Sequence, residues 1–189
     1  MAIMKKLAYL TYDLESKFSG KAADILLYYS SIIGFITGVI YACIDLRINP
    51  FTIKKITICE TIDDSTDIVS RMIAKKIDEY ELIFSPNSLI KTMDNEPYDR
   101  NIPMLCCGFR MGKHEMRHVW QTTYNPELME QEDEHIDPDF QLTEWDADSY
   151  AFSDEPILKD VEALKRAKYD DTWWHCIFKE DGLEAPPPH

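Results

Sequence analysis

The stretch His114-Glu115-Met116-Arg117-His118 places two histidines four residues apart, with a glutamate directly after the first. In an α-helix, residues i and i+4 lie on one face, so both imidazoles can bind a single metal ion. The carboxylate of Glu115 then lies beside that ion, where it can take a proton from bound water. No proline or glycine occurs between Gly112 and Pro126, so a helix of several turns is allowed. The stretch therefore predicts a helix that carries two zinc ligands and a base.

A second pair of acidic residues follows farther along the chain. Glu144 and Asp148 are four residues apart in a segment without helix breakers, so they share one face of a second predicted helix. A catalytic zinc ion usually has three protein ligands and one water. Glu144 can complete the set begun by His114 and His118, and Asp148 can accept a hydrogen bond from a ligand imidazole. Asp146 is the alternative third ligand, although it faces a different direction on a helix.

The two segments together resemble the paired HExxH and ExxxD motifs of the gluzincin metallopeptidases. The finer pattern of Ala147, Tyr150 and Ala151 is similar to that of small bacterial and phage zincins of the ImmA/IrrE kind. The resemblance covers residues 106–152, and His118 is not followed by the glycine and third histidine of metzincins. It implies that the zinc ligands are His114, His118 and Glu144. It also implies that Glu115 is the general base and that Asp148 orients a ligand histidine.

This resemblance also implies an architecture and an activity. The expected fold is α+β and zincin-like, with a small mixed or antiparallel sheet packed on the HExxH helix and further helices. The expected activity is zinc-dependent hydrolysis of peptide bonds by a metalloendopeptidase. In zincins an edge strand upstream of the motif helix pairs with the substrate backbone, and residues 102–109 are the candidate strand. We assign the donor that stabilises the oxyanion to His175, with alternatives at Tyr124, Tyr150 and Tyr169.

The length bounds the chain to one domain, or one domain with an appendage. The 189 residues are 45% hydrophobic and 12% aromatic, which is enough for a core. We expect one domain over residues 1–182 and a flexible, proline-rich tail over residues 183–189. Five cysteines at irregular spacing argue against a disulfide framework and for a reducing, cytoplasmic location. The N-terminus has no convincing cleavage site of a secretory signal.

The longest apolar segment has two interpretations. Residues 26–44 carry no charge over a length close to that needed to cross a bilayer. Small residues recur there at every fourth position, which favours close helix packing: Ser30, Gly34, Gly38 and Ala42. We favour a buried helix over residues 22–44, because several tyrosines and serines are polar for a lipid environment. A membrane anchor is the alternative.

Periodicity predicts the remaining elements. Alternating isoleucines predict a strand over residues 53–62, and short apolar runs predict strands over residues 82–85 and 101–110. Apolar residues at helical spacing predict a helix from Ile68 to Ile77. Pro86-Asn87 predicts a turn.

The net charge of −14 is unevenly distributed. No lysine or arginine occurs between His118 and Lys159, and acidic residues crowd residues 127–155. This stretch is either a solvated loop or an acidic rim that attracts cationic peptides. The same charge disfavours binding to nucleic acid.

The competing class of function is a non-catalytic interaction protein. An acidic chain can mimic nucleic acid or inhibit a basic partner, with zinc used only to hold the fold. A structural zinc ion has four protein ligands and no open position, and His135 or Cys107 can be the fourth ligand. The number of protein ligands therefore discriminates an enzyme from this alternative.

Overall fold

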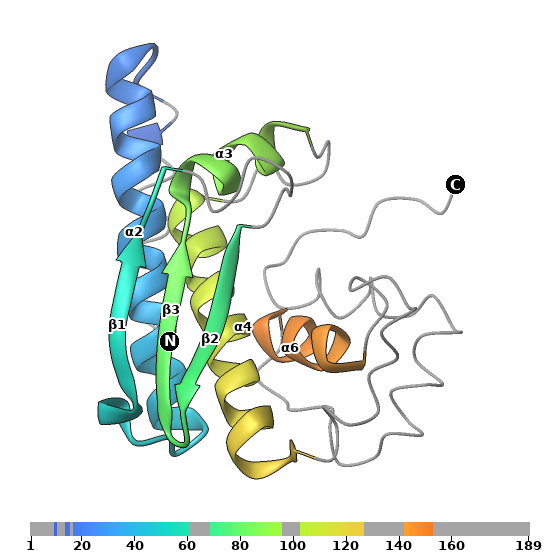
Figure 1. Cartoon of the computed structure of the whole chain (residues 1–189). Coiled ribbons are helices and arrows are strands. Elements are labelled where there is room, and N and C mark those ends of the chain that lie inside the picture. Colours follow the sequence, from blue (N-terminus) through green and yellow to red (C-terminus); the bar gives the residue numbers. More distant parts are fainter. Residues whose placement is uncertain are drawn as a thin grey trace, which may run out of the picture. The chain divides into compact units, whose positions relative to one another are not determined.

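The computed structural model describes Leu10 and residues 14–15, 17–60, 69–95, 103–126 and 142–152. These residues form four main helices and a three-stranded mixed sheet (Figure 1), so the expected α+β class is confirmed. The chain divides into two compact units, and the boundary falls inside a helix, after Met116. The helices are α2 (Lys21–Asp45), α3 (Pro86–Asn95), α4 (Met104–Tyr124) and α6 (Leu142–Phe152). The strands are β1 (Ile53–Ile58), β2 (Ser70–Lys76) and β3 (Glu79–Phe84).

The sheet has the order β1-β3-β2, so β2 forms one edge among the described strands. β3 runs parallel to β1 and antiparallel to β2. The turn between β2 and β3 holds Asp78 at φ 57°, a left-handed conformation that aspartate tolerates. Along β3, Tyr80, Leu82 and Phe84 alternate and are buried. The ring of Phe84 stacks on that of Phe35 with centroids 4.4 Å apart, so this face of the sheet packs on α2.

Glycines on both helices hold α2 against the first half of α4. Gly34 and Gly38 of α2 face the backbone of α4, and Gly108 and Gly112 of α4 face the backbone of α2. A Cβ atom added to any of the four would collide with a carbonyl oxygen of the opposite helix. The two backbones therefore approach more closely than any larger residue allows. The seam of small residues in α2 is the surface that packs on α4.

A different face of α2 carries large apolar side chains that are exposed. By length and composition alone, this helix could cross a membrane. Helix α2 confirms the helix expected over residues 22–44. The choice between a buried helix and a membrane anchor stays a prediction. The cytoplasmic location also stays a prediction. The exposed residues are Ile25, Tyr29, Ile33, Ile36, Ile40 and Ile44.

The strand predicted over residues 101–110 is wrong, and with it the candidate substrate strand 102–109. α4 begins at Met104, directly after Pro103, and continues through this segment. A short apolar run does not distinguish a buried strand from a buried helix. Here Gly108 is tolerated in a helix interior, despite its unfavourable entropy, because it allows the close packing on α2.

The helix predicted from Ile68 to Ile77 is also wrong, because Ser70–Lys76 is strand β2. Pairing with β3 across a tight turn gives these residues backbone partners, which outweighs the helical spacing of their apolar side chains. Pro86-Asn87 opens helix α3 instead of forming a free turn. The backbone N–H of Ser88 donates to the Ser85 hydroxyl, which caps that helix.

The strands predicted over residues 53–62 and 82–85 are confirmed as β1 and β3, although β1 ends at Ile58. The single domain expected over residues 1–182 stays a prediction. The tail at residues 183–189 lies outside the described residues.

Glu81 connects all three strands on the second face of the sheet. Its carboxylate accepts a hydrogen bond of 2.7 Å from Thr57 of β1. It also pairs with Lys55 of β1 at an N–O distance of 3.2 Å and with Lys75 of β2. The bonds from Lys75, Thr57 and Lys55 lower the pKa of Glu81 from 4.5 to about 2.

We therefore expect the stability of the sheet to depend on pH through the ionisation of Glu81. A pKa lower in the folded than in the unfolded chain adds stability above pH 4.5, and this contribution is lost as the pH falls through about 2. Urea unfolding between pH 6 and pH 2 should show a smaller decline for Glu81→Gln than for the parent chain. Glu79→Gln, on the same strand at an exposed pair with Lys76, should decline like the parent. Parallel declines for Glu81→Gln and the parent would contradict the assignment.

The variant Gly38→Ala tests the close contact between α2 and α4. Alanine is favoured over glycine by about 1 kcal/mol inside a helix, so propensity alone predicts a more stable chain. The collision with the carbonyl oxygen of Phe109 predicts the opposite sign, a loss of about 1–3 kcal/mol. Urea unfolding followed by circular dichroism distinguishes the two. Ile33→Ala, on the exposed face of the same helix, should change stability far less.

Candidate metal centre

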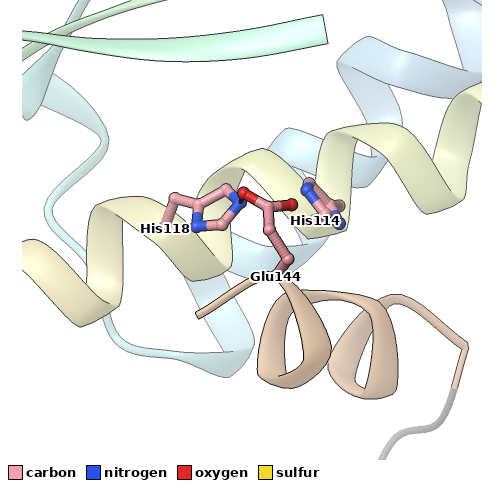
Figure 2. A group of neighbouring side chains, drawn as sticks. All are labelled: His114, His118 and Glu144. Atoms are coloured by element: carbon pink, nitrogen blue, oxygen red, sulfur yellow. Dashed lines mark ion pairs between the residues drawn. The ribbon is translucent and has the colours of Figure 1, made fainter. Parts of the chain in front are cut away.

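Helices α4 and α6 bring together three side chains that can hold one metal ion. His114 and His118 come from α4, and Glu144 comes from the first turn of α6. Their ligand atoms all lie within 4.8 Å of one another. His118 Nε2 lies 3.2 Å from Glu144 Oε1, and these two side chains are 12% and 35% exposed. Figure 2 shows the carboxylate of Glu144 between the two imidazoles.

The donor atoms of this group suit a divalent transition metal. Two imidazole nitrogens and one carboxylate oxygen are a common ligand set of catalytic zinc, with bonds of about 2.0–2.2 Å. A tetrahedral site then separates its ligand atoms by about 3.4 Å, which is close to the 3.2 Å between His118 and Glu144. Within the described part of the chain, no cysteine or further acid joins the three. Three protein ligands leave the fourth position of such a site open.

Glu115, the predicted base, is held by the edge strand of the sheet. The hydroxyl of Ser70, the first residue of β2, donates a hydrogen bond of 2.7 Å to Glu115 Oε1. Glu115 is 1% exposed. Because Glu115 follows His114 in α4, its side chain lies about 100° around the helix from that ligand. The residue that orients the Glu115 carboxylate therefore lies in strand β2, outside the HExxH motif.

Gln121 connects His118 to α6. Its Oε1 lies 2.8 Å from His118 Nδ1. Its Nε2 donates one hydrogen bond to the Thr143 carbonyl and one to Asp146 Oδ2, each 2.8 Å long. The side chain is fully buried. Sequence reasoning missed Gln121, and its only signal is a place three residues after His118, on the same face of the helix.

Asp146, which accepts a hydrogen bond from Gln121, also forms a buried ion pair with Arg117. Arg117 donates to both carboxylate oxygens of Asp146, at 2.7 Å from Nε and 3.2 Å from Nη2. The two side chains are 2% and 0% exposed. The guanidinium carbon lies 4.0 Å from the ring centroid of Trp120 and 5.5 Å from that of Tyr150. A planar, two-pronged donor stacked on an aromatic ring is a role that arginine fills and lysine does not.

The predicted site residues have different outcomes. Glu144 joins the two histidines, whereas its rival Asp146 pairs with Arg117 and is not part of the group. Asp148 lies one turn after Glu144 on α6, and its role in orienting a ligand histidine stays a prediction. The fourth-ligand candidate Cys107 is buried in α4 and does not belong to the group.

The candidates for the oxyanion donor are only partly described. Tyr150 is buried against Arg117, and Tyr124 is exposed at the end of α4. His175 and Tyr169 lie outside the described residues, as do the fourth-ligand candidate His135 and most of the acidic stretch.

Comparisons of the chain with protein-family models, with curated proteins and with solved structures found no match.

Removing one partner of the buried ion pair should strongly destabilise this region. Arg117→Met leaves the carboxylate of Asp146 buried without its cation, and breaking such a pair costs about 3–5 kcal/mol. The free energy of unfolding in urea should fall by about that amount. The double variant Arg117→Met, Asp146→Leu removes both charges and should recover much of the loss. Arg71→Met, at an exposed position of β2, should change stability by less than about 0.5 kcal/mol. Equal losses in the single and double variants would contradict this account.

Proposed function

We propose that this chain is a zinc-dependent metalloendopeptidase, in which His114, His118 and Glu144 hold the zinc ion and Glu115 is the general base. The observation that carries the proposal is the convergence of the three predicted ligands, from two helices, within 4.8 Å. The resemblance of the two motifs to those of gluzincins supports peptide hydrolysis as the reaction. Among the described residues only three ligands converge, which would leave a fourth position for the water that a catalytic site requires.

A zinc ion held here would lower the pKa of a bound water to about 7 and polarise a peptide carbonyl. The residues of the chain would then move the protons. Glu115 takes the proton of the attacking water and passes it to the leaving amine. Because the Ser70 hydroxyl holds Oε1 of Glu115, the direction of the base is fixed before a substrate arrives.

Strand β2 takes the place of the rejected strand 102–109 as the proposed partner of the substrate backbone. It lies at an edge of the described sheet, and an edge strand has unpaired N–H and C=O groups on one side. Its first residue, Ser70, bonds to the proposed base. An extended peptide that added to this edge would run past Glu115.

Cationic peptide or protein segments are the proposed substrates. No lysine or arginine occurs between His118 and Lys159, so the local charge attracts positive side chains. His175 remains the proposed donor to the oxyanion. A non-catalytic acidic protein with a structural zinc ion is the alternative, and it requires a fourth protein ligand.

The variant Glu115→Gln separates catalysis from metal binding. It removes the base and none of the three ligands, so it should keep about one zinc ion per chain and lose hydrolysis by about 10²–10⁴-fold. Metal analysis and cleavage of fluorogenic lysine-rich and arginine-rich peptides measure the two properties. His118→Leu should lose both zinc and activity.

The matched control is Glu60→Gln, at an exposed position far from α4 in the sequence, which should keep both properties. Full activity in Glu115→Gln would reject Glu115 as the base. A parent chain that binds zinc through four protein ligands and cleaves no peptide would support the structural-zinc alternative.

A further inference from the structure

The hydrogen-bond acceptors around Gln121 determine which tautomer His118 adopts. The Gln121 amide faces three groups: the Thr143 carbonyl, the Asp146 carboxylate and the Nδ1 atom of His118. A carbonyl oxygen accepts hydrogen bonds only, and so does a carboxylate that is paired through both oxygens with an always-charged arginine. The amide nitrogen of Gln121 must therefore point to these two groups. Its oxygen is left to face the imidazole.

This orientation fixes the proton on His118. An amide oxygen accepts and cannot donate, so the 2.8 Å contact with Nδ1 is a hydrogen bond only if Nδ1 carries hydrogen. In the neutral imidazole, the lone pair is then on Nε2. Nε2 is the atom that lies 3.2 Å from Glu144 Oε1, within the metal-binding group. The ring is thus held in the tautomer and the direction that a metal ligand requires.

The same contacts also hold helix α6, which carries Glu144. Thr143 and Asp146, which receive the two amide hydrogens of Gln121, flank Glu144 on the first turns of α6. Arg117, which lies inside the HExxH stretch of α4, forms an ion pair with Asp146 of α6. A displacement of α6 along α4 would break these bonds and leave buried polar groups unpaired.

We propose that Gln121 is a positioning residue for the metal site: it sets the tautomer and direction of His118, and the Arg117–Asp146 pair holds Gln121 in the orientation that does so. The proposal deepens the proposed function, because it rests on His118 and Glu144 as metal ligands. It assigns a role to an arginine inside the motif and to a glutamine beyond it.

The test measures zinc affinity by competition with a chelator, together with the visible absorption of the Co²⁺-substituted full-length chain. Gln121→Met keeps a similar volume and loses the acceptor and both donors. We expect its zinc Kd to rise by about 10–100-fold, with altered cobalt bands and a helical content like that of the parent chain.

The matched control is Thr122→Val, which removes a hydroxyl that bonds to the His118 backbone carbonyl and leaves the imidazole untouched. It should bind zinc like the parent. The double variant Arg117→Met, Asp146→Leu removes the carboxylate that receives one amide hydrogen of Gln121, together with the arginine that pairs with it. Its zinc Kd should also rise, and it carries the test if Gln121→Met does not fold.

The outcomes separate this inference from the proposed function. Unchanged zinc affinity and cobalt bands in Gln121→Met would overturn the positioning role. Unchanged values in the double variant Arg117→Met, Asp146→Leu would overturn it too. Zinc binding that depends on Gln121 in a chain that cleaves no peptide would keep the inference and reject the peptidase. A parent chain that binds neither zinc nor cobalt would overturn both.

Discussion

The pairing of Arg117 with Asp146 is the constraint on which the arrangement of α4 and α6 depends. Two opposite charges that are 2% and 0% exposed give little net stability, because their desolvation offsets much of their attraction. They give specificity instead, since any other register of α6 leaves a charge buried and unpaired. Thr143 and Glu144 lie in the same helix as Asp146, so the register that satisfies the charge also places Glu144.

Two different kinds of contact act on α4. Along its first half, Gly108 and Gly112 bring its backbone against α2, where only glycine fits. His114 follows Gly112 by two residues, which is about 200° around a helix. The face that packs on α2 is therefore nearly opposite to the face that carries the histidines. The glycine contacts bring the first half of α4 against α2. In the second half of α4, Arg117 and Gln121 bond to Asp146 of α6.

The sequence predicted what local spacing can determine. The i, i+4 spacing put His114 and His118 on one face, and the same rule turned Asp146 away from Glu144. Spacing could not predict Ser70 or Gln121 as partners of Glu115 and His118, because those contacts depend on which elements meet. The errors have the same origin: the segment 101–110 and the strand β2 are apolar enough for helix or strand, and their tertiary partners decided between the two.

The polarity of the site argues for a cation at its centre. If Gln121 holds the proton of His118 on Nδ1, then Nε2 and Glu144 Oε1 face each other at 3.2 Å as two acceptors. Such a pair is stable only with a positive charge between its members. A proton can join two of the three groups, whereas a metal ion binds all three together with a further ligand. The three ligand atoms, all within 4.8 Å of one another, therefore form a group that could hold a metal ion, and no fourth protein ligand joins them among the described residues.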